Sequence, residues 1–143
     1  MTDRNPKQEP AERPEVVPLE DDSQQPRILV AEDEPDIRQF YSEVLGSAGY
    51  QVDTVTDGKE AWDALQTRTY ALVITDRNMP RLSGADLFRI IRANGMMMPV
   101  ILATGTLPLN DEGLFFDAVL AKPFLGSDLN EAVSKFIKSP QGL

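Results

Sequence analysis

The chain of 143 residues contains no cysteine and no histidine. The absence of cysteine excludes a disulfide framework and a thiol nucleophile. The absence of histidine excludes histidine-based triads, histidine general bases and histidine–metal sites. No apolar run approaches the roughly 20 residues of a membrane span, and the N-terminus lacks the apolar core of a signal peptide. We therefore expect a cytoplasmic protein of one domain.

Positive charge is also scarce. Fourteen lysines and arginines stand against 23 aspartates and glutamates, which gives a formal net charge of −9. Binding to nucleic-acid phosphates requires clusters of lysine and arginine. We expect neither nucleic acid nor a membrane to be a direct partner.

The two ends of the chain differ from its middle. Residues 1–26 are polar, acidic and rich in proline. Such a segment buries too little apolar surface to offset the entropy of ordering it. We expect residues 1–26 to be a disordered leader, either a solvated linker or a docking tail, and residues 139–143 to be a flexible tail.

From Arg27 onward, short apolar runs alternate with segments of helical periodicity. The expected strands are Ile28–Ala31, Tyr50–Val55, Ala71–Thr75, Pro99–Ala103 and Ala118–Ala121. The expected helices are Asp36–Ala48, a segment beginning at Asp57-Gly58, Gly84–Asn94 and a last helix capped by Ser127 or Asp128. This alternation predicts an α/β fold, a parallel five-stranded sheet with helices on both faces. Because Thr106–Gly113 has poor helical periodicity and a proline, we expect the fourth helix to be short or disordered.

Polar side chains stand where four of these strands end. Glu32 and Asp33 follow the first strand, Asp76 ends the third, Thr104 ends the fourth and Lys122 follows the fifth. A parallel sheet aligns its strand ends, and ligands bind at the carboxyl edge of such sheets. Each residue also has an ordinary explanation, as a turn residue, an acid at a helix start or a solvated lysine.

Taken together, these residues suit a metal and a phosphoryl group. Clustered carboxylates repel one another unless a cation neutralises them, and Mg²⁺ needs only one or two carboxylates plus phosphate oxygens. A lysine and a hydroxyl suit the remaining oxygens of a phosphoryl group. The set therefore predicts a carboxylate that accepts a phosphoryl group with Mg²⁺ as cofactor.

Four motifs occur in order, LVAEDEPDIR, TDRNMPRLSG, ILATG and AKPF. With them, residues 27–138 resemble the receiver domain of two-component response regulators. The resemblance implies a flavodoxin-like (βα)5 fold with strand order 2-1-3-4-5 and a cis Lys122–Pro123 bond. It implies that Asp76 is the phospho-acceptor and that Thr104 and Lys122 contact the phosphoryl group. It also implies that Asp33, Asp76 and the Asn78 carbonyl bind Mg²⁺, and that Glu32 holds the ion through water.

The implied function is a stand-alone response regulator. It would accept a phosphoryl group from a histidine kinase or a histidine phosphotransferase protein and signal by contact with an unknown downstream protein. It would catalyse its own Mg²⁺-dependent phosphorylation and dephosphorylation without a turnover substrate. By resemblance, the kinase would dock on the exposed side of Asp36–Ala48 and on the loop at Pro123-Phe124.

Three features depart from the family pattern. Val119 stands where the family usually carries Tyr or Phe, the segment from Thr104 to Lys122 is about four residues short, roughly one helical turn, and the acid pair is Glu-Asp rather than Asp-Asp. We hypothesise that signalling uses the loop after the fourth strand and the patch Leu114–Phe116 instead, although such an apolar cluster is more often core.

Three alternatives stay open. The chain can be a phosphorylation-independent module that keeps the receiver fold, or a receiver fragment of a hybrid histidine kinase. A Mg²⁺-dependent phosphohydrolase would need a second acid and a cap over its substrate, and the sequence offers a candidate for neither.

Overall fold

Five short segments form the strands of one sheet in the computed structural model, which describes residues 25–105 and 116–138. The strands are β2 (Arg27–Ala31), β3 (Gln51–Val55), β4 (Leu72–Asp76), β5 (Val100–Thr104) and β6 (Ala118–Ala121). The helices are α2 (Pro35–Ser47), α3 (Gly58–Thr67), α4 (Gly84–Ala93) and α5 (Gly126–Ser134). Each predicted strand is present with its ends within one residue of the prediction.

All neighbouring strands are parallel, in the order β3-β2-β4-β5-β6. In chain order this is 2-1-3-4-5, so the predicted topology is confirmed. After β2 the chain continues to β3 on one side of the sheet, whereas after β4 it continues to β5 on the other side. The segments that follow β2 and β4 therefore diverge and leave a crevice at the carboxyl ends of these two strands. This crevice is where the predicted polar residues should meet.

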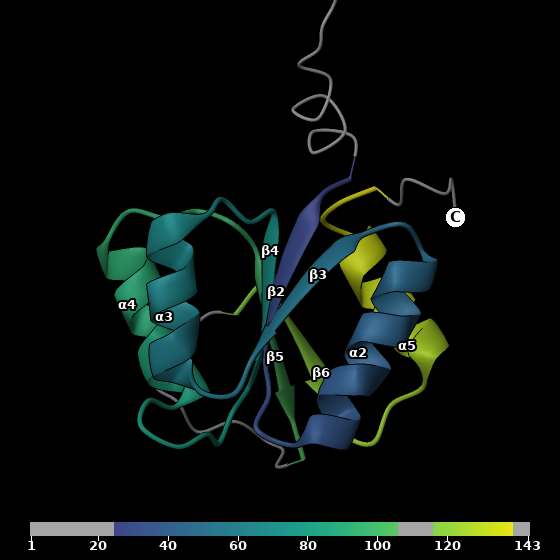
Figure 1. The fold of residues 1–143 in the computed structure, drawn as a ribbon, viewed down its shortest axis with the longest axis horizontal. Helices are drawn as coiled ribbons and strands as arrows, with labels where there is room; N and C mark the ends of the chain where they lie inside the picture. Colours follow the sequence, from purple (N-terminus) through teal and green to yellow (C-terminus); the bar gives the residue numbers. More distant parts are fainter. Residues whose placement is uncertain (1–24, 106–115, 139–143) are drawn as a thin grey trace, which may run out of the picture.

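The two faces of the sheet are covered by different helix pairs (Figure 1), α2 and α5 on one face and α3 and α4 on the other. The side chains of β2 show why, since successive residues of a strand point to opposite faces. Ile28 and Val30 pack with α2 and α5, whereas Leu29 and Ala31 pack with α3 and α4. The three inner strands are buried almost throughout, which explains their continuous apolar sequences.

The last helix begins earlier than predicted. Leu125 occupies the N-cap position and Gly126 is the first helical residue, so the expectation that Ser127 or Asp128 caps this helix is wrong. Asp128 lies in the first turn, and its carboxylate accepts a hydrogen bond from the Leu125 N–H at 2.9 Å. The acid thus satisfies the helix start from inside the helix, a position that also suits the helix dipole.

The segment between β5 and β6 was expected to hold a reduced fourth helix. Thr106–Gly113 lies outside the described residues, as do the predicted leader up to residue 24 and the tail 139–143. Phe116 is described, and its ring centroid lies 4.6 Å from that of Phe88, in the core under α3 and α4. Phe116 therefore contributes to packing, while the hypothesis of a signalling surface stays a prediction for Leu114, which is outside the described residues.

Within residues 25–105 and 116–138, no helix is both long and apolar enough to cross a membrane.

Candidate phosphoryl-transfer and metal site

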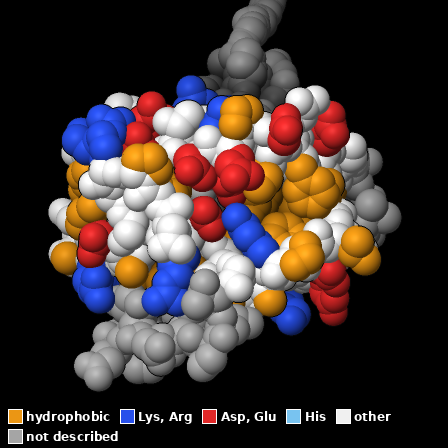
Figure 2. All heavy atoms as spheres, turned by 90° about the horizontal axis from the view of Figure 1, so that it is seen from below, with side chains coloured by type: hydrophobic (Ala, Val, Ile, Leu, Met, Phe, Trp, Pro, Cys, Tyr) orange, Lys and Arg blue, Asp and Glu red, His pale blue; other side chains and the backbone are white. Residues whose placement is uncertain are grey.

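Acidic side chains gather on the face that carries the carboxyl ends of the strands. Figure 2 looks onto this face, where red acidic groups lie at the centre with a blue basic group beside them. Glu32 and Asp33 directly follow β2, and Asp76 is the last residue of β4. One carboxylate oxygen from each of these three residues lies within 4.8 Å of the others. The structure thus brings together the three carboxylates that the sequence predicted.

Lys122 reaches this cluster from the other side. Its ammonium nitrogen lies 3.0 Å from Asp76 Oδ1 and 3.2 Å from Glu32 Oε1. The Lys122–Pro123 peptide bond is cis, as the resemblance implies. The backbone N–H of Lys122 donates to the carbonyl of Thr104 at 2.8 Å, which holds the residue after β6 against the end of β5.

Thr104 lies next to the acidic cluster in the sheet. It is the last residue of β5, it is buried, and its neighbour Ala103 pairs with Asp76 across the two strands. Asn78 lies exposed two residues beyond Asp76, in the loop between β4 and α4. All six predicted site residues therefore lie at the carboxyl edge of the sheet or directly beyond it.

Burial and mutual charge control the ionisation of the cluster. Burial raises the pKa of Glu32, against the opposing effects of the Glu34 N–H and the Lys122 ammonium. Burial disfavours the charged form of Lys122, but the hydrogen bond to Asp76 and the charges of Asp76 and Glu32 outweigh it and raise the lysine pKa. Burial, followed by the same two carboxylates, raises the pKa of Tyr41, so this phenol is neutral. The lysine stays protonated and partly neutralises the cluster.

Tight backbone packing fixes the strand end that carries Asp76. A Cβ atom on Gly84 would lie 2.3 Å from the Asp76 carbonyl oxygen, so only glycine allows α4 to start this close to β4. The N–H of Gly84 donates to the carbonyl of Arg77, and the N–H of Arg77 donates to the carbonyl of Ala103. Asp76 is therefore held between β5 and the first turn of α4.

The ion pair between Asp57 and Arg81, near the site, is not predicted by the sequence analysis. The buried carboxylate of Asp57 accepts from Nε of Arg81 at 2.8 Å, and its Oδ2 lies 2.8 Å from Arg81 Nη2. Asp57 also caps α3 by accepting from the N–H of Glu60. The sequence pattern predicts Asp57-Gly58 only as a turn into the helix, although Asp before such a segment is also an N-cap signal. Nothing in the local sequence around Arg81 signals its partner.

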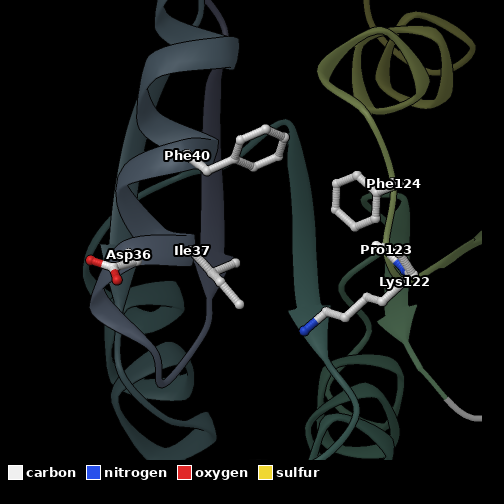
Figure 3. Close-up of a pocket in the computed structure, with 6 residues that line it drawn as sticks. All are labelled: Asp36, Ile37, Phe40, Lys122, Pro123 and Phe124. Carbon is white, nitrogen blue, oxygen red and sulfur yellow. The ribbon is translucent and has the colours of Figure 1, made fainter.

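An apolar groove of about 520 Å³ lies beside the acidic cluster. It is lined by Asp36, Ile37 and Phe40 of α2 and by Lys122, Pro123 and Phe124. In Figure 3 the rings of Phe40 and Phe124 face each other, with 5.9 Å between their centroids, while Asp36 points away. The hydrophobic surface of the groove therefore lies directly next to Lys122 of the charged site.

The chemistry of the donors fits Mg²⁺. The cluster offers only carboxylate oxygens, which are the hard ligands that Mg²⁺ prefers, and it lies at the surface, where the ion can keep several waters. An adjacent ammonium and a threonine at the next strand end suit a bound phosphoryl group. The arrangement is thus able to hold a metal and a phosphoryl group side by side.

Comparison with known proteins identifies the family and the relatives of this chain. The model of the response regulator receiver domain family matches residues 28–134. Response regulator RppA of Synechocystis sp. is 41% identical over 109 residues, which cover 72% of this chain and 47% of RppA. The chain thus spans about half the length of that relative.

A shorter relative and a solved structure match more completely. The response regulator receiver protein CpdR of Brucella abortus is 36% identical over 115 residues, covering 78% of this chain and 96% of CpdR. The response regulator TrrA of Thermotoga maritima, solved in complex with Mg²⁺-BeF, superposes with a TM-score of 0.73 at 34% identity. That match covers 79% of this chain and all of the TrrA chain.

Proposed function

This chain belongs to the response regulator receiver domain family, and we propose that Asp76 accepts a phosphoryl group from the phosphohistidine of a histidine kinase or phosphotransfer protein. The observation that carries the proposal is the contact of one ammonium, that of Lys122, with both Asp76 and Glu32 inside a cluster of three carboxylates. Acids gathered in this way are costly unless they serve to bind a cation.

In the transfer step, a carboxylate oxygen of Asp76 forms a bond to phosphorus, and the bond from phosphorus to the donor's imidazole nitrogen breaks. The imidazole keeps that electron pair and takes up a proton. Lys122 lies within hydrogen-bond distance of Asp76, so its ammonium neutralises negative charge on the transferred group. Thr104, at the end of the neighbouring strand β5, donates a hydrogen bond from its hydroxyl to a phosphoryl oxygen.

The clustered carboxylates of Glu32, Asp33 and Asp76 would hold Mg²⁺. The carbonyl of Asn78, two residues beyond Asp76, would be a further ligand. When bound, the ion supplies positive charge to the phosphoryl oxygens. In dephosphorylation, a water oxygen forms a bond to phosphorus, and the bond from phosphorus to the Asp76 oxygen breaks. Inorganic phosphate leaves, and the Asp76 carboxylate is restored. The chain thus undergoes self-catalysed phosphorylation and dephosphorylation without a separate turnover substrate.

We propose that the phosphodonor protein docks in the groove of Ile37, Phe40 and Phe124, because an apolar surface next to the acceptor site can orient a partner. The signal then passes to a downstream protein by contact. CpdR is matched over 96% of its length, which supports a stand-alone receiver. Detection of the native protein by antibody in source cells tests this point, since a stand-alone receiver gives a band near 15.9 kDa and a fragment of a hybrid kinase gives a larger one.

The acceptor role is tested by incubating the purified chain with acetyl phosphate and Mg²⁺ and separating the products on a phosphate-affinity gel. We expect a shifted band that disappears in Asp76→Asn and when EDTA removes the metal. Asp63→Asn is the matched control, because Asp63 is an exposed acid on α3 outside the site. Its band should shift as in the unmodified chain.

The second candidate is a phosphorylation-independent interaction module. Val119 favours it, because this β6 side chain is 39% exposed and stands where the family usually carries an aromatic ring. The same experiment separates the two. No incorporation from acetyl phosphate, together with no binding of beryllofluoride, would replace the first proposal by the second.

A further inference from the structure

Arg81 holds an unusual backbone conformation in the loop between β4 and α4. Its φ is 67°, and the N–H of Leu82 donates to the carbonyl of Pro80 at 2.7 Å, which closes a three-residue turn around Arg81. A non-glycine residue adopts this conformation rarely, and such strain persists only where surrounding contacts impose it. The contacts that impose it here are therefore informative.

The guanidinium of Arg81 is held by an acid from another element. Asp57 stands before α3, its side chain is 9% exposed, and it receives both Nε and Nη2 of Arg81 at 2.8 Å. The Arg81 side chain itself is 58% exposed. Exposed ion pairs contribute little as a rule, but here the carboxylate is buried, and one of its oxygens, Oδ2, lies within 2.8 Å of two nitrogens of the rigid guanidinium.

Backbone packing also brings the β4–α4 loop into contact with the start of α3. A Cβ atom on Gly58, the residue after Asp57, would lie 2.2 Å from the Leu82 carbonyl oxygen. Met79 packs against the core under α3 and α4, with its sulfur 3.9 Å from the Thr75 hydroxyl. The loop from Arg77 to Ser83 thus packs closely against the start of α3, and the Asp57–Arg81 ion pair fixes the part of the loop around Arg81.

This loop carries Asn78, whose backbone carbonyl is the proposed fourth ligand to Mg²⁺. We propose that Asp57 and Arg81 form a positioning pair, which holds the β4–α4 loop in the conformation that presents Asn78 to the metal. The inference rests on the proposed function. Its physical basis is that Mg²⁺ demands near-ideal octahedral geometry, so a ligand on a loop binds well only if the loop is fixed.

The test measures Mg²⁺ affinity of the whole chain by isothermal titration calorimetry, without any phosphodonor. Arg81→Ala removes the guanidinium, and Asp57→Asn removes the charge while keeping a good N-cap for α3. We expect each to weaken Mg²⁺ binding roughly tenfold, the low end of the loss for residues that support a ligand indirectly. The double variant should bind no more weakly than the weaker single variant, and Arg81→Lys should restore part of the affinity.

Two exposed ion pairs supply matched controls. Lys59 pairs with Asp63 on α3, and Arg89 pairs with Asp86 on α4, with all four side chains more than half exposed. Lys59→Ala and Arg89→Ala should bind Mg²⁺ as the unmodified chain does.

The outcomes separate this inference from the proposed function. If the unmodified chain binds Mg²⁺ and both single variants bind it equally well, the positioning pair is overturned and the proposed function stands. Additive losses in the double variant would also overturn it, because independent effects do not describe a pair. If the unmodified chain binds no Mg²⁺, both proposals fail. Since Arg81 is exposed, its variants should fold even if Asp57→Asn does not, and they then decide the question.

Discussion

The ammonium of Lys122 lies 3.0 Å from a carboxylate oxygen of Asp76, although the two residues are 46 positions apart in the chain. The parallel sheet makes this contact, because β4 and β6 flank β5 and all three strands end at one edge. The contact counters part of the repulsion between acids that are positioned before any metal arrives. Stability and metal binding are thereby linked through one side chain.

Replacing Lys122 by methionine removes this charge and keeps most of the apolar stem. Glu32 is 1% exposed and would lose its counter-ion, which is costly for a buried acid. We expect Lys122→Met to lower the free energy of unfolding by about 2 kcal/mol in EDTA, less than for a fully buried pair, because the lysine is 23% exposed. Mg²⁺ should restore more stability to the variant than to the unmodified chain. Urea denaturation with EDTA or Mg²⁺ checks this, and identical midpoints in EDTA would contradict it.

The residue patterns were sufficient to predict a parallel sheet and the residues that gather at its edge, whereas the strand order came from the resemblance to receiver domains. Continuous apolar runs such as Leu72–Ile74 mark strands buried on both faces, and a parallel sheet then forces Glu32, Asp76 and Lys122 together. These features follow from strong local patterns combined with one topological rule.

Other features depend on tertiary contacts that leave no local signal. The Asp57–Arg81 ion pair joins residues 24 positions apart, and an arginine in a polar loop gives no sign of its partner. The sequence predicts a start of α5 that is too late, because Asp128 resembles an N-cap residue, whereas its carboxylate acts from within the first turn. The groove beside Phe124 likewise exists only once α2 and the loop after β6 are adjacent.

Tyr70 stabilises the amino-terminal edge of the sheet, away from the site. Its hydroxyl donates to Asp53 at 2.7 Å, and Asp53 also pairs with Arg27 at 2.9 Å. We expect Tyr70→Phe to lower the free energy of unfolding at pH 7 by about 1 kcal/mol, the usual net value of one hydrogen bond. Chemical denaturation measures the loss. Phosphorylation from acetyl phosphate should be unchanged, and a loss of it would show that the edge is coupled to the site.

The same phenol predicts a dependence on alkaline pH. Burial, followed by the hydrogen bond to Asp53, raises the pKa of Tyr70 to about 12 in the folded chain, against about 10 for an unperturbed tyrosine. The stability that Tyr70 contributes is therefore fully present below pH 10 and is lost as pH rises through 12. The difference in stability between the unmodified chain and Tyr70→Phe should shrink over this interval. A constant difference would contradict the assignment.

Asp57 predicts the opposite dependence at acidic pH. Burial alone would raise its pKa, but the Glu60 N–H and then the hydrogen bond and charge of Arg81 lower it below the usual value. An acid of this kind contributes stability above its unfolded pKa, about 3.9, and loses it as pH falls through the lower folded value. We expect Asp57→Asn to be destabilised at pH 6 and to approach the unmodified chain in stability as pH falls below about 4. Thermal unfolding of both chains between pH 2.5 and pH 6 checks this, and parallel curves would exclude a role for the Asp57 charge.

The groove next to Lys122 predicts that docking of a protein donor and phosphoryl chemistry can be separated. Ile37 lines the groove on α2 and is partly buried, so Ile37→Asp would place a charge in a surface that the donor must cover. An unpaired charge is costly to bury in an interface, so we expect transfer from an autophosphorylated histidine kinase to fall by roughly tenfold or more. Phosphorylation by acetyl phosphate needs no docking and should be unchanged.

Ser42→Asp, at an exposed position of the same helix, should affect neither reaction. The kinase is first chosen from those of the source organism by its transfer to the unmodified chain. Equal transfer rates for Ile37→Asp and the unmodified chain would mean that the donor docks elsewhere, whereas loss of both reactions would mean that Ile37 supports the acceptor site itself.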